Sequence, residues 1–470
     1  MATTETRPSA AGGLEGFFHP RERGSDVRTE VIAGLATWLT MAYILVVNPA
    51  ILSSVPDANG TSLPFDQLVT VTALAAGVLC IAMGLATNYP FALAAGLGLN
   101  AFVAFTLVAA AGLSWEQAMG VIVIEGVVIA LLVLTGFRQA VLDAIPMDLK
   151  RAIGIGIGLF IAFIGLVDAG IVVHPESGAP IVTLNSNLTT LPMLTFAIGL
   201  AITATLVARK VKGALLIGII ATTVVASIVN AIADAAIFPP GVATWPDKVV
   251  DAPDFSLVGN FSLDIFSGET VAFATALALI LSVMLSDFFD TMGTVIGLGG
   301  EAGLLTPDGK LPGIQRVLFV DSLGAALGGA VSSSSNTTYI ESAAGISDGG
   351  RTGLTAVVVG VLFLLAMFLA PIAAIVPTQA TAPILIIVGY FMMRMVREID
   401  WRDAGIGIPV LLTMIVMPFT FSITNGVGAG FLSYTVIQVL RGRATQVHWL
   451  MYLVSAVFLW YFVEGLVPLG

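Results

Sequence analysis

The chain has 470 residues, of which 57% are apolar and 10% are charged, and its mean hydropathy is +0.99. Soluble globular proteins carry about 25% charged residues, so this composition excludes a soluble multidomain protein. The net charge of −11 argues against nucleic-acid binding, which needs a basic face. We therefore expect an all-α polytopic protein embedded in the lipid bilayer. Its single cysteine, Cys80, excludes an internal disulfide.

The apolar stretches predict fourteen transmembrane segments, because roughly 20 apolar residues cross the hydrocarbon as a helix. These candidate spans are 28–54, 66–88, 91–110, 115–137, 148–168, 191–208, 213–236, 269–297, 314–331, 335–349, 352–375, 380–397, 404–421 and 424–440. A last apolar stretch, 446–464, contains two Trp and two Tyr residues, which favour the headgroup region. It is predicted to lie along the interface or to form an extra helix. Residues 1–27 are polar and have no apolar core, so we expect no signal peptide.

Basic residues predict the orientation of these spans. They precede the first span or follow an even-numbered one: Arg21, Arg23, Arg28, Arg138, Lys150, Arg151, Arg209, Lys210, Lys212, Lys310, Arg316, Arg394, Arg397, Arg402, Arg441 and Arg443. In the loops 55–65, 169–190 and 237–268, the only Lys or Arg residue is Lys248. Because cytoplasmic loops are rich in Lys and Arg, we expect a multi-pass protein of the plasma (inner) membrane with a cytoplasmic N-terminus.

The long polar loop 237–268 divides the spans into seven and seven, which requires the two halves to be inverted relative to each other. The third and tenth spans are poor helices. One begins with Tyr89-Pro90 and reads AAGLGLNAF, and the other opens with SSSSNTT at 332–338. Irregular backbone at membrane depth is tolerated only where it is buried or lines a cavity. We predict that both spans are broken into a short strand and a half-helix, and that substrate binds beside them. Most other glycines, including Gly154, Gly156 and Gly158, are expected to serve helix packing.

Carboxylates within the apolar stretches are candidate functional groups, because charge at membrane depth is costly. Asp287 and Asp290 share one face of the eighth span, in LSDFFDTMGT, and Glu341 follows the serine cluster. Asp321 and Glu125 are candidates with simpler alternatives, a helix N-cap and a bond to a neighbouring hydroxyl. Likewise, Asp290 could brace a neighbouring helix, and Asn100 could satisfy freed backbone groups instead of binding a ligand.

The surroundings of these carboxylates restrict the ligand. No Lys or Arg lies in the apolar stretches around them, and the three histidines, His19, His174 and His448, fall outside the predicted midplane. Such a site suits a neutral, hydrogen-bonding substrate or a cation and repels an anion. If transport is coupled to a proton, the carboxylates must carry it. We expect no metal or other cofactor.

Four stretches resemble the AzgA-like branch of the nucleobase–ascorbate transporter family: RTEVIAGLATWLTMAYILVVNPAIL, AAGLGLNAFVAF, SDFFDTMGTVIG and YIESAAGISDGGRTGLTAVVVG. Members of this branch are purine permeases for adenine, guanine or hypoxanthine. The resemblance implies proton symport and an elevator-like movement of a core domain against a gate domain, often in a homodimer. The core domain would comprise 28–137 and 269–375, and the gate domain 148–236 and 380–440.

The resemblance also implies roles for individual residues. The implied substrate-binding set is Asn100, Ala101, Phe102, Asp287, Thr338 and Glu341, and the implied proton-coupling set is Asp287, Asp290, Asp321 and Glu341. The tenth-span opening departs from the usual Gly-Thr-Ser-Thr of the branch, so no role is carried over to Asn336 or Thr337.

Three rival interpretations remain. An anion exchanger with this fold would need a positive residue or bare helix N-termini at the site. The carboxylates Asp287 and Glu341 would repel an anion, which argues against this interpretation. A membrane aspartyl enzyme would normally take its two carboxylates from two facing elements, whereas Asp287 and Asp290 share one. A channel is less consistent with broken helices and protonatable acids in inverted repeats.

Overall fold

Helices account for nearly all regular structure in the computed structural model, which describes residues 13–135, 144–175, 180–233, 237–266, 271–306 and 310–464. The first half contains α1 (Leu14–Phe18), α2 (Val27–Met41), α3 (Ile44–Ser53), α4 (Phe65–Thr87), β1 (Leu93–Ala95), α5 (Leu97–Ala101), the π-helical η2 (Phe102–Ala110), α6 (Trp115–Thr135), α8 (Met147–Asp168), β2 (Val172–Val173), β3 (Thr183–Leu184), α9 (Leu191–Ala208) and α10 (Ala214–Ile232). The second half contains α11 (Phe273–Glu301), α12 (Ile314–Ala330), β4 (Asn336–Thr338), α13 (Ser342–Ser347), α14 (Gly353–Ala366), α15 (Ala370–Ala374), α16 (Thr378–Met393), α17 (Ala404–Thr420), α18 (Ile423–Leu440) and α19 (Trp449–Glu464). The predicted all-α membrane fold is confirmed, while Arg138 lies outside the described residues.

Within the described ranges, ten helices are long and apolar enough to cross a membrane. Three more apolar helices are shorter, at Leu97–Ala110, Ala404–Thr420 and Trp449–Val463. Each predicted span coincides with one or more helices, but the total of fourteen stays a prediction because several of them are too short to span alone. The stretch 446–464 forms the extra helix α19, which packs on α18 and α11.

The helix contacts follow the inverted repeat. Helix α4 packs along α14, and α12 packs along α6. In the inverted repeat α4 corresponds to α12 and α14 to α6, so a two-fold relation converts one pair into the other. The backbones touch where the sequence has glycine. A Cβ on Gly84 would lie 2.3 Å from the carbonyl oxygen of Gly353, and a Cβ on Gly158 of α8 would lie 2.6 Å from Met392 Cβ. The predicted packing role of the Gly154–Gly158 run is therefore confirmed.

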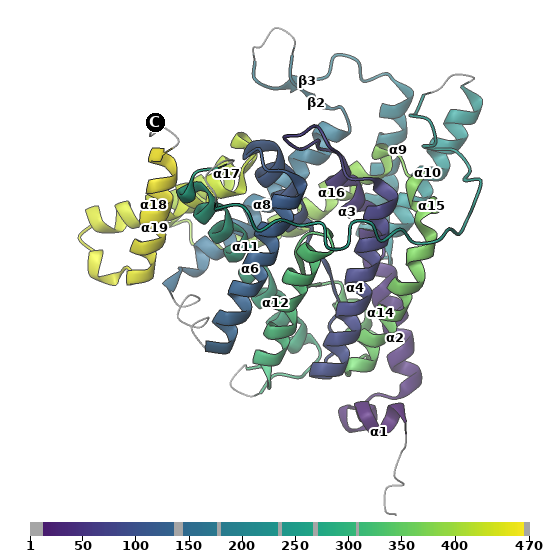
Figure 1. The fold of residues 1–470 in the computed structure, drawn as a ribbon, viewed down its shortest axis with the longest axis horizontal. Coiled ribbons are helices and arrows are strands. Elements are labelled where there is room, and N and C mark those ends of the chain that lie inside the picture. The colour runs from purple at the N-terminus through teal and green to yellow at the C-terminus, as the bar shows by residue number, and fades with distance from the viewer. Residues whose placement is uncertain are drawn as a thin grey trace, which may run out of the picture.

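Two sets of helices pack mainly among themselves. The first, called here the α4 group, comprises α2 to α6 and α11 to α15, and the second, the α8 group, comprises α8 to α10 and α16 to α18. In Figure 1, α2, α4, α12 and α14 lie below the centre, while α17 and α18 lie at the left and α9 and α10 at the right. The connection between α10 and α11 runs over the α4 group, where Asp251 N–H bonds to Phe368 O and Ser262 N–H to Glu116 O.

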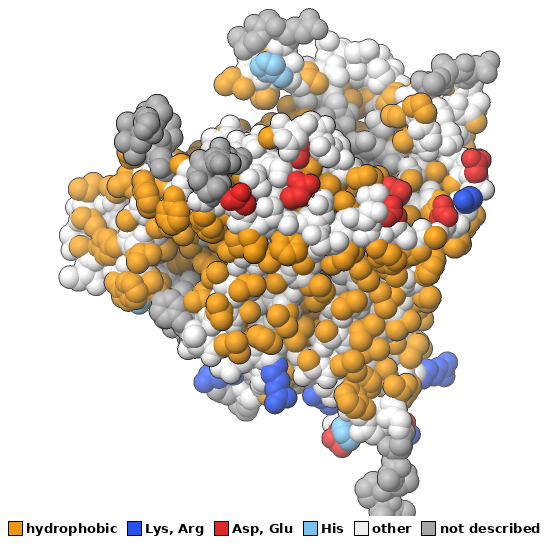
Figure 2. Space-filling model, in the orientation of Figure 1, with side chains coloured by type: hydrophobic (Ala, Val, Ile, Leu, Met, Phe, Trp, Pro, Cys, Tyr) orange, Lys and Arg blue, Asp and Glu red, His pale blue; other side chains and the backbone are white. Residues whose placement is uncertain are grey.

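The surface has the belt of a membrane protein. Figure 2 shows apolar side chains covering a band between one end that carries Lys and Arg and an opposite end that carries mostly Asp and Glu. Exposed apolar side chains on the helices α2 and α6 include Val31, Leu35 and Leu131. The band and its charge asymmetry agree with helices that cross a bilayer in a single preferred orientation.

Candidate functional site

Two short strands meet inside the α4 group. Strands β1 and β4 are antiparallel, with Leu93 opposite Thr338 and Ala95 opposite Asn336. The pairing extends further, because Gly96 N–H bonds to Ser335 O at 3.0 Å. Helices α5 and η2 follow β1, and α13 follows β4. The predicted break of the third and tenth spans into strand and half-helix is confirmed, and the structure adds that the two breaks pair with each other.

The serine run makes the turn from α12 into β4. Ser332 and Ser334 have φ values of 61° and 72°, in the left-handed region that residues other than glycine seldom adopt. Ser332 Oγ donates to Leu257 O and to Asn260 O, both at 3.1 Å, which fixes the start of the turn. Strained backbone of this kind persists where the surrounding structure determines it, often at ligand sites.

Asp321 joins three elements around β4. Its Oδ1 accepts from Thr338 N–H at 2.8 Å and from Thr338 Oγ1 at 2.7 Å, and its Oδ2 accepts from Thr291 Oγ1 at 2.6 Å. Asp321 lies in the interior of α12, which begins at Ile314 after a left-handed Gly313. The alternative of a helix N-cap is therefore wrong, and the carboxylate instead ties α11 and β4 to α12.

Several buried polar atoms near the paired strands lack a hydrogen-bond partner within the described part of the chain. They are both amide atoms of Asn100, Oδ1 of Asp287, both carboxyl oxygens of Glu125, and the hydroxyls of Ser333, Ser334 and Ser335. Buried polar groups are nearly always satisfied by protein, water or ligand. Asn100 therefore does not satisfy freed backbone groups. The hydroxyl of Ser335 lies beside the Glu125 carboxyl group, so the alternative of a bond to a neighbouring hydroxyl stays open. The cluster is what a site for a hydrogen-bonding ligand requires.

The second half of α11 presents an exposed face that begins at Asp290. Asp287, one turn earlier, is 1% exposed, whereas Asp290, Gly293 and Gly297 are exposed. A Cβ on Gly293 or Gly297 would meet no atom within 4 Å. Asp290 makes no hydrogen bond or ion pair with another described residue, so the bracing alternative has no contact to support it. The face leads from Asp290 to the end of α11 at Glu301.

Glu341 is positioned by a residue that the sequence interpretation missed. Tyr43 Oη donates to Glu341 Oε1 at 2.7 Å, and Tyr43 lies at the break between α2 and α3. Asn48 in α3 was also missed, and its Nδ2 donates to Thr72 Oγ1 at 2.8 Å and to Ser333 O at 3.2 Å. A polar residue within an apolar span was the available signal for Asn48.

The remaining predicted ligand residues lie next to the paired strands. Ala101 and Phe102 are both fully buried at the junction of α5 and η2, and π-helical segments are frequent at functional sites. Thr338 is engaged by Asp321 through its backbone and its hydroxyl. Contact of these three residues with substrate stays a prediction.

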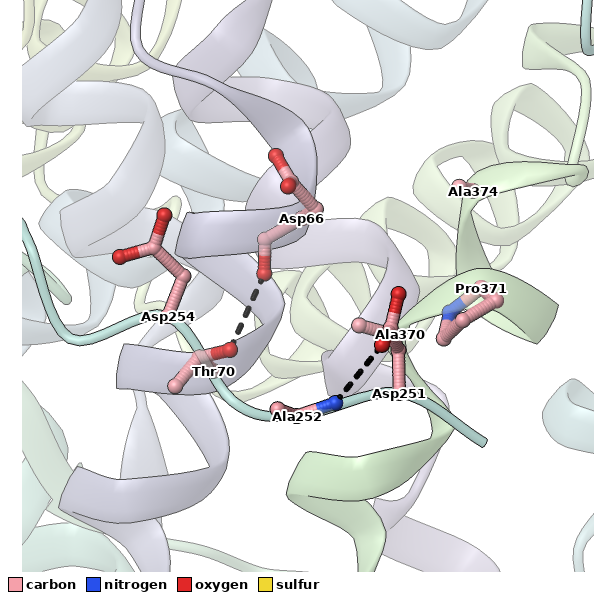
Figure 3. Close-up of a pocket in the computed structure, with 8 residues that line it drawn as sticks. All are labelled: Asp66, Thr70, Asp251, Ala252, Asp254, Ala370, Pro371 and Ala374. Atoms are coloured by element: carbon pink, nitrogen blue, oxygen red, sulfur yellow. Dashed lines mark hydrogen bonds between the residues drawn. The ribbon is translucent and has the colours of Figure 1, made fainter. Parts of the chain in front are cut away.

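A hollow of about 200 Å³ elsewhere contains none of the predicted site residues (Figure 3). It lies beside the first turns of α4 and α15, and three carboxylates line it: Asp66, Asp251 and Asp254. Hydrogen bonds from Ser256 hold the pKa of Asp254 below its ordinary value. The paired strands contact α4 further along, where Cys80 Sγ donates to Leu93 O at 3.2 Å. This hollow is therefore separate from the candidate site.

Comparison with known proteins assigns the chain to a family of transporters. The model of the xanthine/uracil permease family, described as "Permease family", matches residues 28–460. The adenine permease AdeP of Escherichia coli is 40% identical over 97% of both chains. The guanine/hypoxanthine permease PbuG of Bacillus subtilis is 39% identical over 96% of this chain and 99% of its own.

The fold also occurs in solved structures. The transmembrane domain of the cyanobacterial bicarbonate transporter BicA matches with a TM-score of 0.61 at 14% identity, covering 86% of this chain and 97% of that one. Murine Slc26a9, an anion transporter in the inward-facing state, matches with a TM-score of 0.60 at 10% identity over 93% and 74%. At these identities the likeness shows the fold alone. The chain is thus no enzyme but a multi-pass membrane transporter, and it belongs to the xanthine/uracil permease family, whose members similar to it include adenine and guanine/hypoxanthine permeases.

Proposed function

We propose that the protein imports purine nucleobases, adenine, guanine or hypoxanthine, by proton symport. The observation that carries this proposal is the cluster of buried polar atoms at Asn100, Asp287 and the serine run that have no hydrogen-bond partner among the described residues. A purine is flat and mostly neutral, with donors and acceptors around its edge, so it can satisfy amide and carboxyl groups together. The names of the relatives AdeP and PbuG support the same substrate class.

Proton coupling is assigned to the acids of the α4 group. Asp287, Asp290 and Glu341 are the proposed carriers, and Asp321 supports them by holding β4 in place. Asp287 is buried, and no Lys, Arg or His is among the buried side chains of the described residues. A carboxyl group in such surroundings takes up a proton more readily than in water. The proton is thus the proposed coupling ion, and no cofactor is needed.

Movement of the α4 group against the α8 group is the proposed transport step. We take the α4 group as the core domain, at 28–137 and 269–375, and the α8 group as the gate domain, at 148–236 and 380–440. All of the acids above belong to the α4 group, so a rigid displacement would carry the site as a unit. We propose that the protein lies in the inner membrane, with its N-terminus and the end that carries Lys and Arg on the cytoplasmic side. We also propose that it assembles as a homodimer.

The two groups meet in an aromatic cluster. Phe421, which follows α17, packs against Phe105 of η2 and against Phe160 and Phe163 of α8, with ring centroids 6.0, 5.3 and 5.6 Å away. Helix η2 leads to the first turn of α6, where Glu116 O accepts a hydrogen bond from Ser262 N–H of the connection between α10 and α11. This connection lies at the end of the molecule that carries mostly Asp and Glu (Figure 1 and Figure 2). The exposed face of α11 leads toward the opposite end. These contacts support a conformation closed to the outside and open to the cytoplasm.

Replacing Phe421 by Ala should open the outer side. In a Cys80→Ser background, we expect labelling of a Thr106→Cys variant by a membrane-impermeant thiol reagent to rise about fivefold or more, because each edge-to-face ring pair contributes about 0.5–1.5 kcal/mol. Phe419→Ala is the matched control, since Phe419 is 79% exposed and lies outside the cluster. Equal labelling in both variants would show that the cluster does not close the outer side.

Uptake into proteoliposomes tests the proposed function directly. Radiolabelled adenine, guanine, hypoxanthine, uracil and sulfate are supplied with and without an inward proton gradient. We expect uptake of at least one purine, accelerated by the gradient, and no uptake of sulfate. Sulfate uptake would instead make the protein an anion transporter like its structural neighbours. Purine uptake at the same rate with and without the proton gradient would contradict proton symport.

A further inference from the structure

Glu125 is a buried carboxyl group to which no role has been assigned above. It lies within α6, is 0% exposed, and neither of its oxygens has a hydrogen-bond partner among the described residues. Such a group is costly to bury unless it is paired or protonated. The contacts within α6 therefore do not explain why a carboxyl group is buried at position 125.

Close helix packing presents Glu125 to the site. A Cβ on the adjacent Gly126 would lie 2.3 Å from Ala326 N, so α6 and α12 touch backbone to backbone. In this position the Glu125 carboxyl group adjoins the carboxyl group of Asp287 on α11 and the hydroxyl of Ser335. Asp321 of α12 is also close enough to interact electrostatically with Glu125 and Asp287. Asp287 Oδ1 is itself buried, and no described residue donates a hydrogen bond to it.

The charged groups around this pair are all acidic. Asp287 is also influenced by Asp321 of α12 and by Asp290, one turn further along α11. Two adjoining carboxyl groups without a cation cannot both be ionised at moderate pH, so at least one of them holds a proton. That proton is then available for a bond between the two groups.

We propose that Glu125 is a positioning residue for Asp287 and that the two carboxyl groups share a proton. The shared proton fixes the orientation of Asp287, so that its free oxygen faces a neutral nitrogen heterocycle in a defined hydrogen-bonding state. Substrate binding and proton binding are thereby linked at one pair. This inference rests on the proposed function, because it takes Asp287 to contact the substrate.

The test is Glu125→Gln in the full-length protein, reconstituted in proteoliposomes. Glutamine keeps the shape but cannot ionise, so we expect purine binding to change less than about threefold while the midpoint of the pH profile of uptake moves by about one unit or more. Glu116→Gln is the matched control, because Glu116 lies in the first turn of the same helix, where its Oε1 accepts a hydrogen bond from Asn260 Nδ2. Glu125→Asp, which can still ionise, should restore most of the wild-type profile.

The outcomes separate this inference from the proposed function. Absence of purine uptake by the wild type would defeat the proposed function, whereas a normal wild type with an unmoved Glu125→Gln profile would defeat only the shared proton. If Glu125→Gln does not fold, infrared titration of the wild type decides. A protonated carboxyl band that persists at pH 7 in the wild type and is lost in Asp287→Asn supports the pair. A band that is absent from the wild type, or unchanged in Asp287→Asn, overturns it.

Discussion

Asp287→Asn is expected to lower purine uptake by about 100-fold or more while leaving the protein folded. Asn has nearly the same shape but cannot ionise, so it can neither hold the proton shared with Glu125 nor offer a charged acceptor to the substrate. Hydrogen bonds to charged groups contribute about 1.5–3 kcal/mol, and a 100-fold loss corresponds to about 2.7 kcal/mol. The initial rate of uptake per reconstituted transporter, together with thermal unfolding in detergent, measures both effects.

Asp66→Asn serves as the control for this substitution. Asp66 lies in the first turn of α4, beside the separate hollow of Figure 3, and is remote from the paired strands. We expect this variant to transport at the wild-type rate. Wild-type uptake by Asp287→Asn would remove Asp287 from the site, and the interpretation of the unpartnered polar cluster would have to change.

The sequence predicts the broken spans because their causes are local. Proline and glycine before Asn100, and a run of serines before Glu341, cannot form a stable helix in lipid, so the breaks are visible without a structure. The pairing of the two breaks is not local. It joins β1 to β4 across more than half of the chain, and only tertiary contacts bring Leu93 opposite Thr338.

Other features of the site depend on geometry that residue type does not encode. Tyrosine is common near membrane interfaces, so nothing marks Tyr43 until the break between α2 and α3 places its hydroxyl on Glu341. The N-cap interpretation of Asp321 was wrong because the helix start is set earlier, by the left-handed Gly313. The candidate acids could be named from the sequence, but their partners could not.

Asp321→Ala is expected to destabilise the protein by about 3 kcal/mol or more. The substitution removes the acceptor of three buried donors, Thr338 N–H, Thr338 Oγ1 and Thr291 Oγ1, and each unsatisfied buried group costs about 1–3 kcal/mol. Since β4 would then lose its attachment to α11 and α12, we expect loss of transport as well. Thermal unfolding in detergent measures the loss. Thr291→Val, which removes one of these bonds together with the 2.7 Å bond between Thr291 Oγ1 and Thr337 Oγ1, should cost less than Asp321→Ala.

Asp321→Asn distinguishes a structural role from a role in proton transfer. The amide oxygen can still accept from Thr338, and the amide nitrogen can donate to the hydroxyl of Thr291, so most of the stability should return. Because the Asp321 oxygens are already occupied by three donors, we expect this variant to keep the proton dependence of uptake at a reduced rate. A stable Asp321→Asn protein whose uptake ignores the proton gradient would instead make Asp321 a proton carrier, with Asp287 and Glu341 left to bind the base.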